Sequence, residues 1–256
     1  MTTGASITGL STDLKTGLAF CTRLPFVNSA PATGAEVAQA SWTFPIIGAV
    51  VGVIGALVYW VADGVGLHPF VSGVLVVASI VLVTGCLHED GLADTVDGWG
   101  GGATPEQKLE IMRDSRIGTY GASALALSLM LRTGTVASLA DPALVAPALI
   151  AAHAGARATL PVFMRRVPQA RRDGLSADAG RPPTRSGLAA VLLGLIALVL
   201  CLGFGTALVA ALLVAAATAF MAWLSIKQIG GQTGDVLGAQ EQISEILILL
   251  VAAASL

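Results

Sequence analysis

The residues best suited to chemistry lie in one acidic stretch, HEDGLADTVDGWGGG, which runs from His88 to Gly102. If this stretch is helical, Asp90, Asp94 and Asp97 are spaced i, i+4 and i+7 and share one face. Carboxylates one turn apart repel one another unless a cation or a proton lies between them. Hard oxygen ligands without neighbouring thiolates suit Mg²⁺, with Mn²⁺ as an alternative, better than zinc. The spacing therefore predicts a divalent-cation site; the structural alternative is a solvated acidic loop or a set of helix caps.

A second short helix is expected after a glycine turn at Gly98–Gly102. Thr104 is a suitable N-cap for it, because Gln107 stands three residues later and a proline lies between them. On this helix Glu110 and Asp114 are expected to stack at i and i+4. Two acid-faced helices would then converge on one ion, with Asp114 as a further ligand.

Basic and polar residues are interleaved with these acids. Arg113 and Arg116 suit phosphate groups held next to a metal ion, because a guanidinium group forms paired hydrogen bonds to phosphate oxygens. Ser115 between them and His88 at the start of the acidic stretch are further candidates for substrate contacts. His88 is equally consistent with a packed or capping histidine.

Two more polar stretches occur later in the chain. Residues 165–185 read RRVPQARRDGLSADAGRPPTR and contain six arginines. They suit either a flexible clamp for a polyanionic substrate, such as a nucleotide diphosphate, or a basic loop that touches anionic lipid headgroups. The stretch GGQTGDVLGAQEQISE places Thr233 and Asp235 among glycines, where exposed backbone can hold a phosphate or complete a metal shell. The alternative for it is a plain glycine-rich turn before the last helix.

These stretches must be positioned by membrane helices. Of the 256 residues, 55% are hydrophobic and 12% are charged, against about 25% charged in soluble domains. We therefore expect a single-domain (residues 1–256), all-α, polytopic membrane bundle. A span needs about 20 mainly apolar residues. An amphipathic interfacial helix or a structured tail is expected at Ile7–Thr22, and seven candidate spans follow: Phe44–Val61, Leu67–Leu87, Thr119–Leu139, Ala143–Phe163, Gly187–Gly203, Thr206–Ile226 and, as the weakest, Gln242–Leu256.

The basic residues predict which side the polar stretches face, because Lys and Arg concentrate in short cytoplasmic loops. With the N-terminus inside, twelve of the 14 basic residues fall in the N-terminal segment and in three loops on one side, residues 88–118, 165–186 and 227–241. Arg132 and Arg157 fall inside predicted spans, where charges usually line a polar cavity, so Arg157 is a further substrate-binding candidate. The three loops are expected to form one active face on the cytoplasmic side of a bacterial inner membrane.

Four blocks of the chain resemble, in the same order, the signature blocks of the cobalamin synthase family, the adenosylcobinamide-GDP ribazoletransferases. They read HEDGLADTVDG, EIMRDSRIGTYGA, PQARRDGL and GGQTGDVLGAQEQISE. The stretches FCTRLPF and WTFPIIGAVVG are also similar to the start of those enzymes. The resemblance implies a transferase that joins α-ribazole, or its 5′-phosphate, to adenosylcobinamide-GDP, releases GMP and forms adenosylcobalamin or its phosphate. It also implies a requirement for Mg²⁺.

The resemblance gives the polar residues roles that fit their chemistry. Carboxylates around a divalent cation would neutralise phosphate charge and stabilise the leaving GMP. A base near the incoming hydroxyl is also needed, and the spacing does not decide which carboxylate it is. The expected metal ligands are Asp90, Asp94, Asp97 and Asp114; the expected catalytic residues are Asp97, Glu110 and Asp114; the expected substrate-binding residues are His88, Arg113, Ser115, Arg116, Arg157, Thr233 and Asp235.

Two other functions are weighed against this one. The block DTVDG matches the opening of the CDP-alcohol phosphotransferases, but WGGG replaces the Ala-Arg pair that should follow. A cation-coupled transporter would carry acids in mid-span and an internal repeat, whereas the acids here lie in loops and no convincing repeat is found. The formal charge of −2 suggests no nucleic-acid partner. The expected partners are the corrinoid and ribazole substrates and membrane lipid, and abundant Gly and Ala would allow homo-oligomers.

Overall fold

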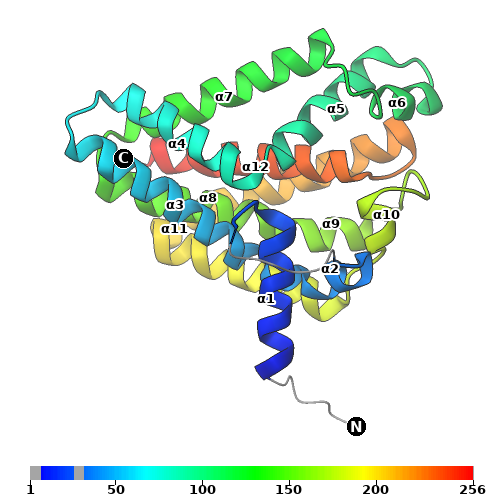
Figure 1. Cartoon of the computed structure of the whole chain (residues 1–256), viewed down its shortest axis with the longest axis horizontal. Helices are drawn as coiled ribbons and strands as arrows, with labels where there is room; N and C mark the ends of the chain where they lie inside the picture. Colours follow the sequence, from blue (N-terminus) through cyan, green and yellow to red (C-terminus); the bar gives the residue numbers. More distant parts are fainter. Residues whose placement is uncertain (1–6, 26–31, 256) are drawn as a thin grey trace.

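The structure, a computed structural model, describes residues 7–25 and 32–255. This part of the chain forms helices and no strand, which confirms the all-α prediction (Figure 1). Phe26, which ends the FCTRLPF block, and Leu256, which ends the last predicted span, lie outside the described residues. The elements are α1 Ile7–Cys21, α2 Gly34–Ala40, the 3₁₀ turn η1 Ser41–Thr43, α3 Phe44–Gly64, α4 Pro69–Thr84, α5 Leu87–Gly101, α6 Pro105–Ile111, α7 Thr119–Leu139, α8 Pro142–Ala158, α9 Leu160–Arg166, α10 Leu175–Ala179, α11 Thr184–Ile229 and α12 Gly234–Ala254.

The chain is a multi-pass membrane protein. In the described part, 5 helical segments are long and apolar enough to cross a membrane, and the number rises to 6 if α4 and α5 together form one bent span. The predicted number of seven spans is therefore not confirmed. The five segments are Gly34–Gly64, Thr119–Leu139, Pro142–Arg166, Thr184–Ile229 and Gly234–Ala254.

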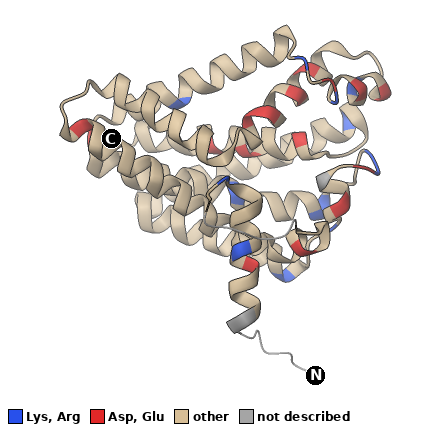
Figure 2. Cartoon of the chain, viewed as in Figure 1, with Lys and Arg blue, Asp and Glu red and all other residues tan. Residues whose placement is uncertain are grey.

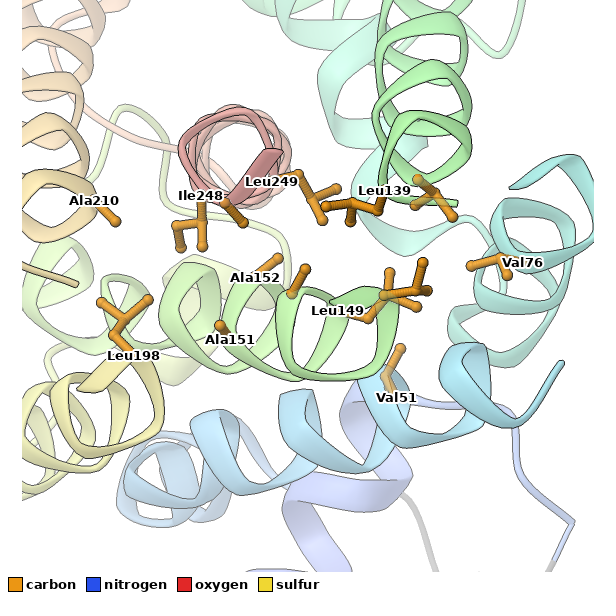
Figure 3. Close-up of a cluster of buried hydrophobic side chains, with 14 of the residues drawn as sticks. Val51, Val76, Leu139, Leu149, Ala151, Ala152, Leu198, Ala210, Ile248 and Leu249 are labelled. Carbon is orange, nitrogen blue, oxygen red and sulfur yellow. The ribbon is translucent and has the colours of Figure 1, made fainter. Parts of the chain in front are cut away.

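Helix α11 accounts for part of the difference, because it contains two of the predicted spans. It has 46 residues, far more than the roughly 30 Å of hydrocarbon requires at about 1.5 Å per residue. The helix breaks at Gly203, where φ is 75° and ψ is 164°, a conformation that suits glycine. Leu198 before the break and Ala210 after it belong to the same hydrophobic cluster (Figure 3). Both halves of α11 therefore contribute to the same hydrophobic core.

Helix α8 lies at the centre of the bundle because its residues are small. It packs against α3, α11 and α12, and Ala151 and Ala152 in its middle are fully buried (Figure 3). The contact with α3 depends on Gly48, where a Cβ atom would lie 2.2 Å from the backbone oxygen of His153. Such close approach of small residues is the usual way in which helices associate in lipid, where water does not drive them together.

The chain bends sharply between α4 and α5, and this bend positions the acidic stretch. Gly85 and Cys86 both adopt the left-handed conformation, with φ values of 65° and 60°. As a result the axes of α4 and α5 differ by 90°. The predicted span Leu67–Leu87 therefore ends early, at Thr84, and α5 leaves in a new direction.

The charged residues gather at one end of the molecule. In Figure 2 most Lys, Arg, Asp and Glu residues lie on the side of α6, α10 and the link between α11 and α12, at the right of the view. The links from α3 to α4 and from α7 to α8 lie at the other end, at the left in Figure 1. The links that carry most of the charges thus lie at one end of the bundle, and the short links from α3 to α4 and from α7 to α8 lie at the other, as the distribution of basic residues predicts.

Candidate functional site

Helix α5 carries the acidic stretch and presents its charges on two faces. Residues 88–97 are helical, as expected from the spacing of the aspartates. His88 and Glu89 are buried, whereas Asp90 is exposed and Asp94 is half-buried. Successive carboxylates at positions 89 and 90 therefore lie in different surroundings.

Helices α5 and α12 cross at two glycines, Gly91 and Gly238, and this crossing brings a further acid to α5. A Cβ atom at Gly91 would lie 2.7 Å from the backbone oxygen of Asp235, and one at Gly238 would lie 3.1 Å from the Cα of Gly91. Side chains at these positions would push α5 and α12 apart. The contact places Asp235, in the first turn of α12, beside the aspartates of α5.

Four carboxylates share this corner of the molecule with one arginine. Coulombic repulsion from Asp90, Asp235 and Asp97 acts on the Asp94 carboxylate, and Arg171 is the cation that offsets it. Arg171 Nη2 lies 3.4 Å from Asp235 Oδ2. The corner therefore has an excess of negative charge that a cation would reduce. Its carboxylate oxygens are the hard ligands that Mg²⁺ prefers.

Thr233 orients one of these acids. It is the N-cap of α12, and its Oγ1 accepts a hydrogen bond from the backbone N–H of Val236 at 3.3 Å. The same hydroxyl donates to Asp235 Oδ2 at 3.0 Å. Because Thr233 is buried, the structure places this predicted substrate contact beneath Asp235.

Asp97 is attached to the start of α7. Its Oδ2 accepts from the backbone N–H of Gly118 at 2.7 Å, and its Oδ1 accepts from that of Gly121 at 2.8 Å. These amide groups belong to the first turn of α7, which has no side-chain cap of its own. A Cβ atom at Gly121 would lie 2.3 Å from Oδ2. Asp97 therefore acts as the cap of α7 and ties that helix to α5.

The segment after α5 confirms one part of the prediction and corrects another. The glycine turn expected at Gly98–Gly102 is wrong, because α5 continues through Gly101. The glycines of this last part of α5 allow close packing: a Cβ at Gly98 would lie 2.4 Å from Met112 Cγ. The predicted N-cap of α6 is confirmed, since Thr104 and Gln107 form a reciprocal capping box.

Asp114 lies beyond α6. The helix ends at Ile111, so the expected stacking of Glu110 and Asp114 on one helix is wrong. Asp114 instead accepts hydrogen bonds from Arg116 N at 3.0 Å and from Arg116 Nη2 at 2.6 Å. These bonds lower the pKa of the Asp114 carboxyl from 3.8 to about 2. Glu110 is exposed on α6.

The other predicted residues of this segment face the second polar loop or solvent. Arg113 Nη2 donates to both oxygens of Asp173 at 2.7 Å, across 60 residues of chain. Both side chains are more than half exposed. Ser115 is exposed in the same segment.

The three polar loops meet at this end of the bundle. Backbone hydrogen bonds join Gln232 N to Pro168 O at 2.8 Å and Ala170 N to Gln232 O at 3.0 Å. Ser176 Oγ also donates to Gln232 Oε1 at 2.9 Å. Lys108 contacts Gln228 through its ammonium group. Loops 88–118, 165–186 and 227–241 therefore form one continuous surface.

A cavity of about 330 Å³ opens beside the aspartates. One wall consists of His88, Asp90, Arg171, Ser176 and Asp235 from α5, α12 and the second loop. Apolar side chains from α1, α2, α3 and α9 also line the cavity. The site thus combines carboxylates that lack a full set of cations with an apolar chamber.

A second charged cluster lies inside the bundle, and sequence reasoning did not identify it as one network. Arg132 Nη1 of α7 donates to Glu89 Oε1 at 2.7 Å, and its Nε lies 2.6 Å from Glu245 Oε1. Arg157 Nη1 of α8 lies 2.5 Å from Glu241 Oε1. These five side chains connect α5, α7, α8 and α12 and are nearly inaccessible to solvent. We call them, with the two histidines described next, the buried ion network.

Two histidines complete the buried ion network. His153 Nδ1 lies 3.3 Å from Glu245 Oε2, and His88 Nδ1 lies 3.6 Å from Glu241 Oε2. Arg157, a predicted substrate contact, is held here by Glu241 and by the backbone oxygen of His153, to which it donates at 3.2 Å. The sequence signal was present, because Arg132 and Arg157 fall in apolar spans and Glu241 and Glu245 are four apart. The pairing of these residues depends on contacts between distant helices.

The ligand geometry of the two clusters differs. Among the described residues, one group of three His, Cys, Asp or Glu side chains has candidate metal-ligand atoms that all lie within 4.8 Å of one another: His153, Glu241 and Glu245. Guanidinium groups of Arg132 and Arg157 already bind the two acids. A resident metal there would displace those cations, so the donor set does not favour one. The α5 aspartates do not form so tight a group, but no guanidinium directly bonds Asp90 or Asp94 among the described contacts.

Comparison with known proteins identifies the relatives of this chain. The family model described as "Cobalamin-5-phosphate synthase" matches residues 13–253. A protein of Bradyrhizobium diazoefficiens named adenosylcobinamide-GDP ribazoletransferase is 54% identical over 249 residues, 97% of this chain and 96% of that protein. Proteins with the same name from Mesorhizobium japonicum and Azorhizobium caulinodans are 47% and 44% identical, over 95% and 93% of this chain and 93% and 94% of theirs. No solved structure matches the chain.

Proposed function

This chain belongs to the cobalamin-5-phosphate synthase family, and from that premise we propose that it joins ribazole to adenosylcobinamide-GDP, the last step in the assembly of cobalamin. The observation that carries the proposal for the site is a group of three carboxylates: Asp90 and Asp235 line the cavity, and Asp94 lies one helical turn after Asp90 on α5. We call these three the rim aspartates; Arg171 is the cation that offsets the repulsion they exert on Asp94. A phosphate-transfer enzyme needs such oxygens for its cation.

The chemistry is a displacement at phosphorus. The ribazole hydroxyl attacks the phosphate attached to cobinamide and forms a new P–O bond. The bond from that phosphorus to the anhydride oxygen breaks, and GMP leaves with the electron pair. A carboxylate takes the hydroxyl proton. Such a reaction requires the charges on both phosphates to be neutralised and the alcohol to be held in line with the bond that breaks.

We assign the divalent cation to the carboxylates at the rim. Asp94 and one of the pair Asp90 and Asp235 would hold Mg²⁺, which would neutralise phosphate charge and stabilise the leaving phosphate, and the other member of the pair would remain free to act as base. Asp97 is also near, but both of its oxygens accept hydrogen bonds from α7, so its role is to hold α5 in place. Asp114 is paired with Arg116, so its proposed role is to orient the Arg116 guanidinium group toward phosphate.

The base is assigned to the carboxylates that line the cavity. Asp90 and Asp235 border the chamber in which a hydroxyl would lie. Glu110 is on the exposed side of α6 and does not line the cavity. A base must be within hydrogen-bond reach of the proton it removes, which favours Asp90 or Asp235 over Glu110.

The location of the active face follows from charge. The three joined loops carry most of the basic residues, and such loops remain in the cytoplasm. We therefore propose that the site faces the cytoplasm from the inner membrane, where phosphorylated substrates are present. The same basic surface would attract the anionic diphosphate of the corrinoid substrate.

The test is an assay in liposomes with ribazole and adenosylcobinamide-GDP, with Mg²⁺ or with EDTA. Wild-type protein should release GMP and form the cobalamin product only with Mg²⁺. Asp90→Asn should lose most of this activity, whereas Asp63→Asn should keep it, because Asp63 is in the last turn of α3, next to the link from α3 to α4 at the other end of the bundle. Product formation in EDTA would refute the cation assignment, and no product from folded wild-type protein would refute the function.

A further inference from the structure

The cavity beside the aspartates is divided into an apolar half and a polar half. Phe20 and Phe44 form one side of the apolar half and stack with ring centroids 5.7 Å apart and planes 8° apart. Leu160, Met164 and Val37 complete it. These five residues come from four different helices, and we call them the apolar wall. The polar half contains Asp90, Arg171, Ser176 and Asp235.

We propose that the apolar wall binds the fused aromatic base of ribazole, with the ribose directed to the polar half. This assignment rests on the proposed function, because it concerns a substrate of that reaction. It adds the location of the acceptor and the residues that select its base.

Size favours ribazole over the corrinoid substrate. The cavity holds about 330 Å³, near the lower end of the roughly 300–1,000 Å³ found for small-molecule pockets. A nucleoside with a two-ring base fits such a volume. Adenosylcobinamide-GDP, with its corrin ring, is several times larger and must bind over the open surface of the three loops.

The apolar wall suits the base of ribazole better than it suits guanine or adenine, the two-ring bases of the corrinoid substrate. Guanine and adenine carry amino groups, and guanine a carbonyl as well, on their edges. Those groups would have no hydrogen-bond partner against Phe20, Leu160 and Met164, and burying an unpaired polar group is costly. The base of ribazole is a benzimidazole with two methyl groups and no such substituent. Its flat ring also suits a wall with two aromatic side chains.

Orientation follows from the polar half. If the base lies against the apolar wall, the ribose hydroxyls lie next to Asp90 and Asp235. Ser176, which is buried and fixed by Gln169 and Gln232, is a further hydroxyl at this wall. The reacting hydroxyl would then be beside the carboxylates assigned to the cation and the base, as the displacement requires.

One experiment fills the cavity. Ala179 also lines it, is buried, and contacts Met164, so Ala179→Leu should place three extra carbons in the chamber. We expect the KM for ribazole to rise at least tenfold and the KM for adenosylcobinamide-GDP to stay within twofold. The matched control is Ala215→Leu, which adds the same atoms to a separate apolar groove of about 540 Å³ between α8, α9 and α11. It should change neither KM.

A second experiment uses the wild-type protein and so needs no variant to fold. Ribosides of benzimidazole without methyl groups, and of adenine, replace ribazole. Loss of each methyl should lower kcat/KM about tenfold, the usual discrimination of an apolar pocket per carbon, and the adenine riboside should be the poorest acceptor. In the Ala179→Leu variant the riboside of benzimidazole without methyl groups should become a better acceptor than ribazole, because the smaller base fits the smaller chamber. Misfolding cannot produce a reversal.

The outcomes separate this inference from the proposed function. If wild-type protein makes cobalamin but Ala179→Leu raises the KM only for adenosylcobinamide-GDP, or neither KM, the cavity does not hold the base. Equal use of all three ribosides would overturn the inference in the same way. If wild-type protein makes no product with any acceptor, the proposed function itself fails.

Discussion

The buried ion network and the aspartates at the cavity rim begin at adjacent residues of one helix but are opposite in character. Glu89 points into the bundle and meets Arg132 at 2.7 Å. Asp90 is exposed and meets repelling carboxylates, with Arg171 as the shared cation. Acids that each have an arginine hold helices together, whereas acids in excess of their cations are available for a metal ion.

The largest effect is expected from breaking the buried ion network. Arg132→Met leaves Glu89 and Glu245 buried without their cation, which should lower the free energy of unfolding by about 3–5 kcal/mol. Equilibrium unfolding in mixed micelles measures it. Arg113→Met is the control, because Arg113 and Asp173 are exposed, and it should cost at most about 1 kcal/mol.

A double change sharpens that result. Adding Glu89→Gln to Arg132→Met removes one unpaired charge and should restore part of the lost stability. Equal costs for Arg132→Met and Arg113→Met would show that the network does not stabilise the bundle.

The rim aspartates should respond in the opposite way. Asp94→Asn removes a cation ligand and should lower the rate of cobalamin formation by about 10²–10³-fold, the usual cost of losing one charge-stabilising group. Stability should stay the same or rise, since repulsion from Asp90, Asp235 and Asp97 is relieved. Initial rates and unfolding are measured on the same preparation. A variant that loses stability and keeps its rate would place Asp94 with the structural acids.

Asp97 tests the boundary between the two groups. It shares a face with Asp90 and Asp94, yet its two hydrogen bonds to Gly118 and Gly121 assign it to the structural acids. Asp97→Asn turns one acceptor into a donor that faces an amide N–H, and should cost about 1–3 kcal/mol of stability. The Mg²⁺ concentration for half-maximal rate should not change. Gly121→Ala, which crowds the same carboxylate, should reproduce the effect; a weaker Mg²⁺ response in Asp97→Asn alone would make Asp97 a ligand.

The sequence predicted the local features of both groups of acids but not the contacts that distinguish them. Local patterns predicted the bounds of α7, the Thr104 cap and the helical phase of the α5 aspartates, because each depends on residues a few positions apart. The bend at Gly85 and Cys86 was missed, since a left-handed cysteine has no sequence signature; Cys86 is exposed, and its backbone N–H donates to Val81 O at 3.0 Å. The partner of Glu89 was also missed, because Arg132 is 43 residues away and nothing local selects it. Pairing decides whether an acid is structural or chemical, so the roles of the acids were the least predictable feature.

The smallest effect is expected at Asp114, and pH distinguishes its predicted catalytic role from the pairing in the structure. Hydrogen bonds from Arg116 lower its pKa from 3.8 to about 2. An acid with a depressed folded-state pKa contributes stability above pH 3.8 and loses it as the pH falls through about 2. The difference in melting temperature between wild type and Asp114→Asn should therefore be small and constant from pH 5 to 8 and vanish near pH 2. Because Asp114 stays ionised throughout that upper range, its replacement should leave the shape of the rate profile unchanged there. A profile that loses its acidic limb in Asp114→Asn would instead identify Asp114 as the base, and would move the chemistry away from the cavity rim.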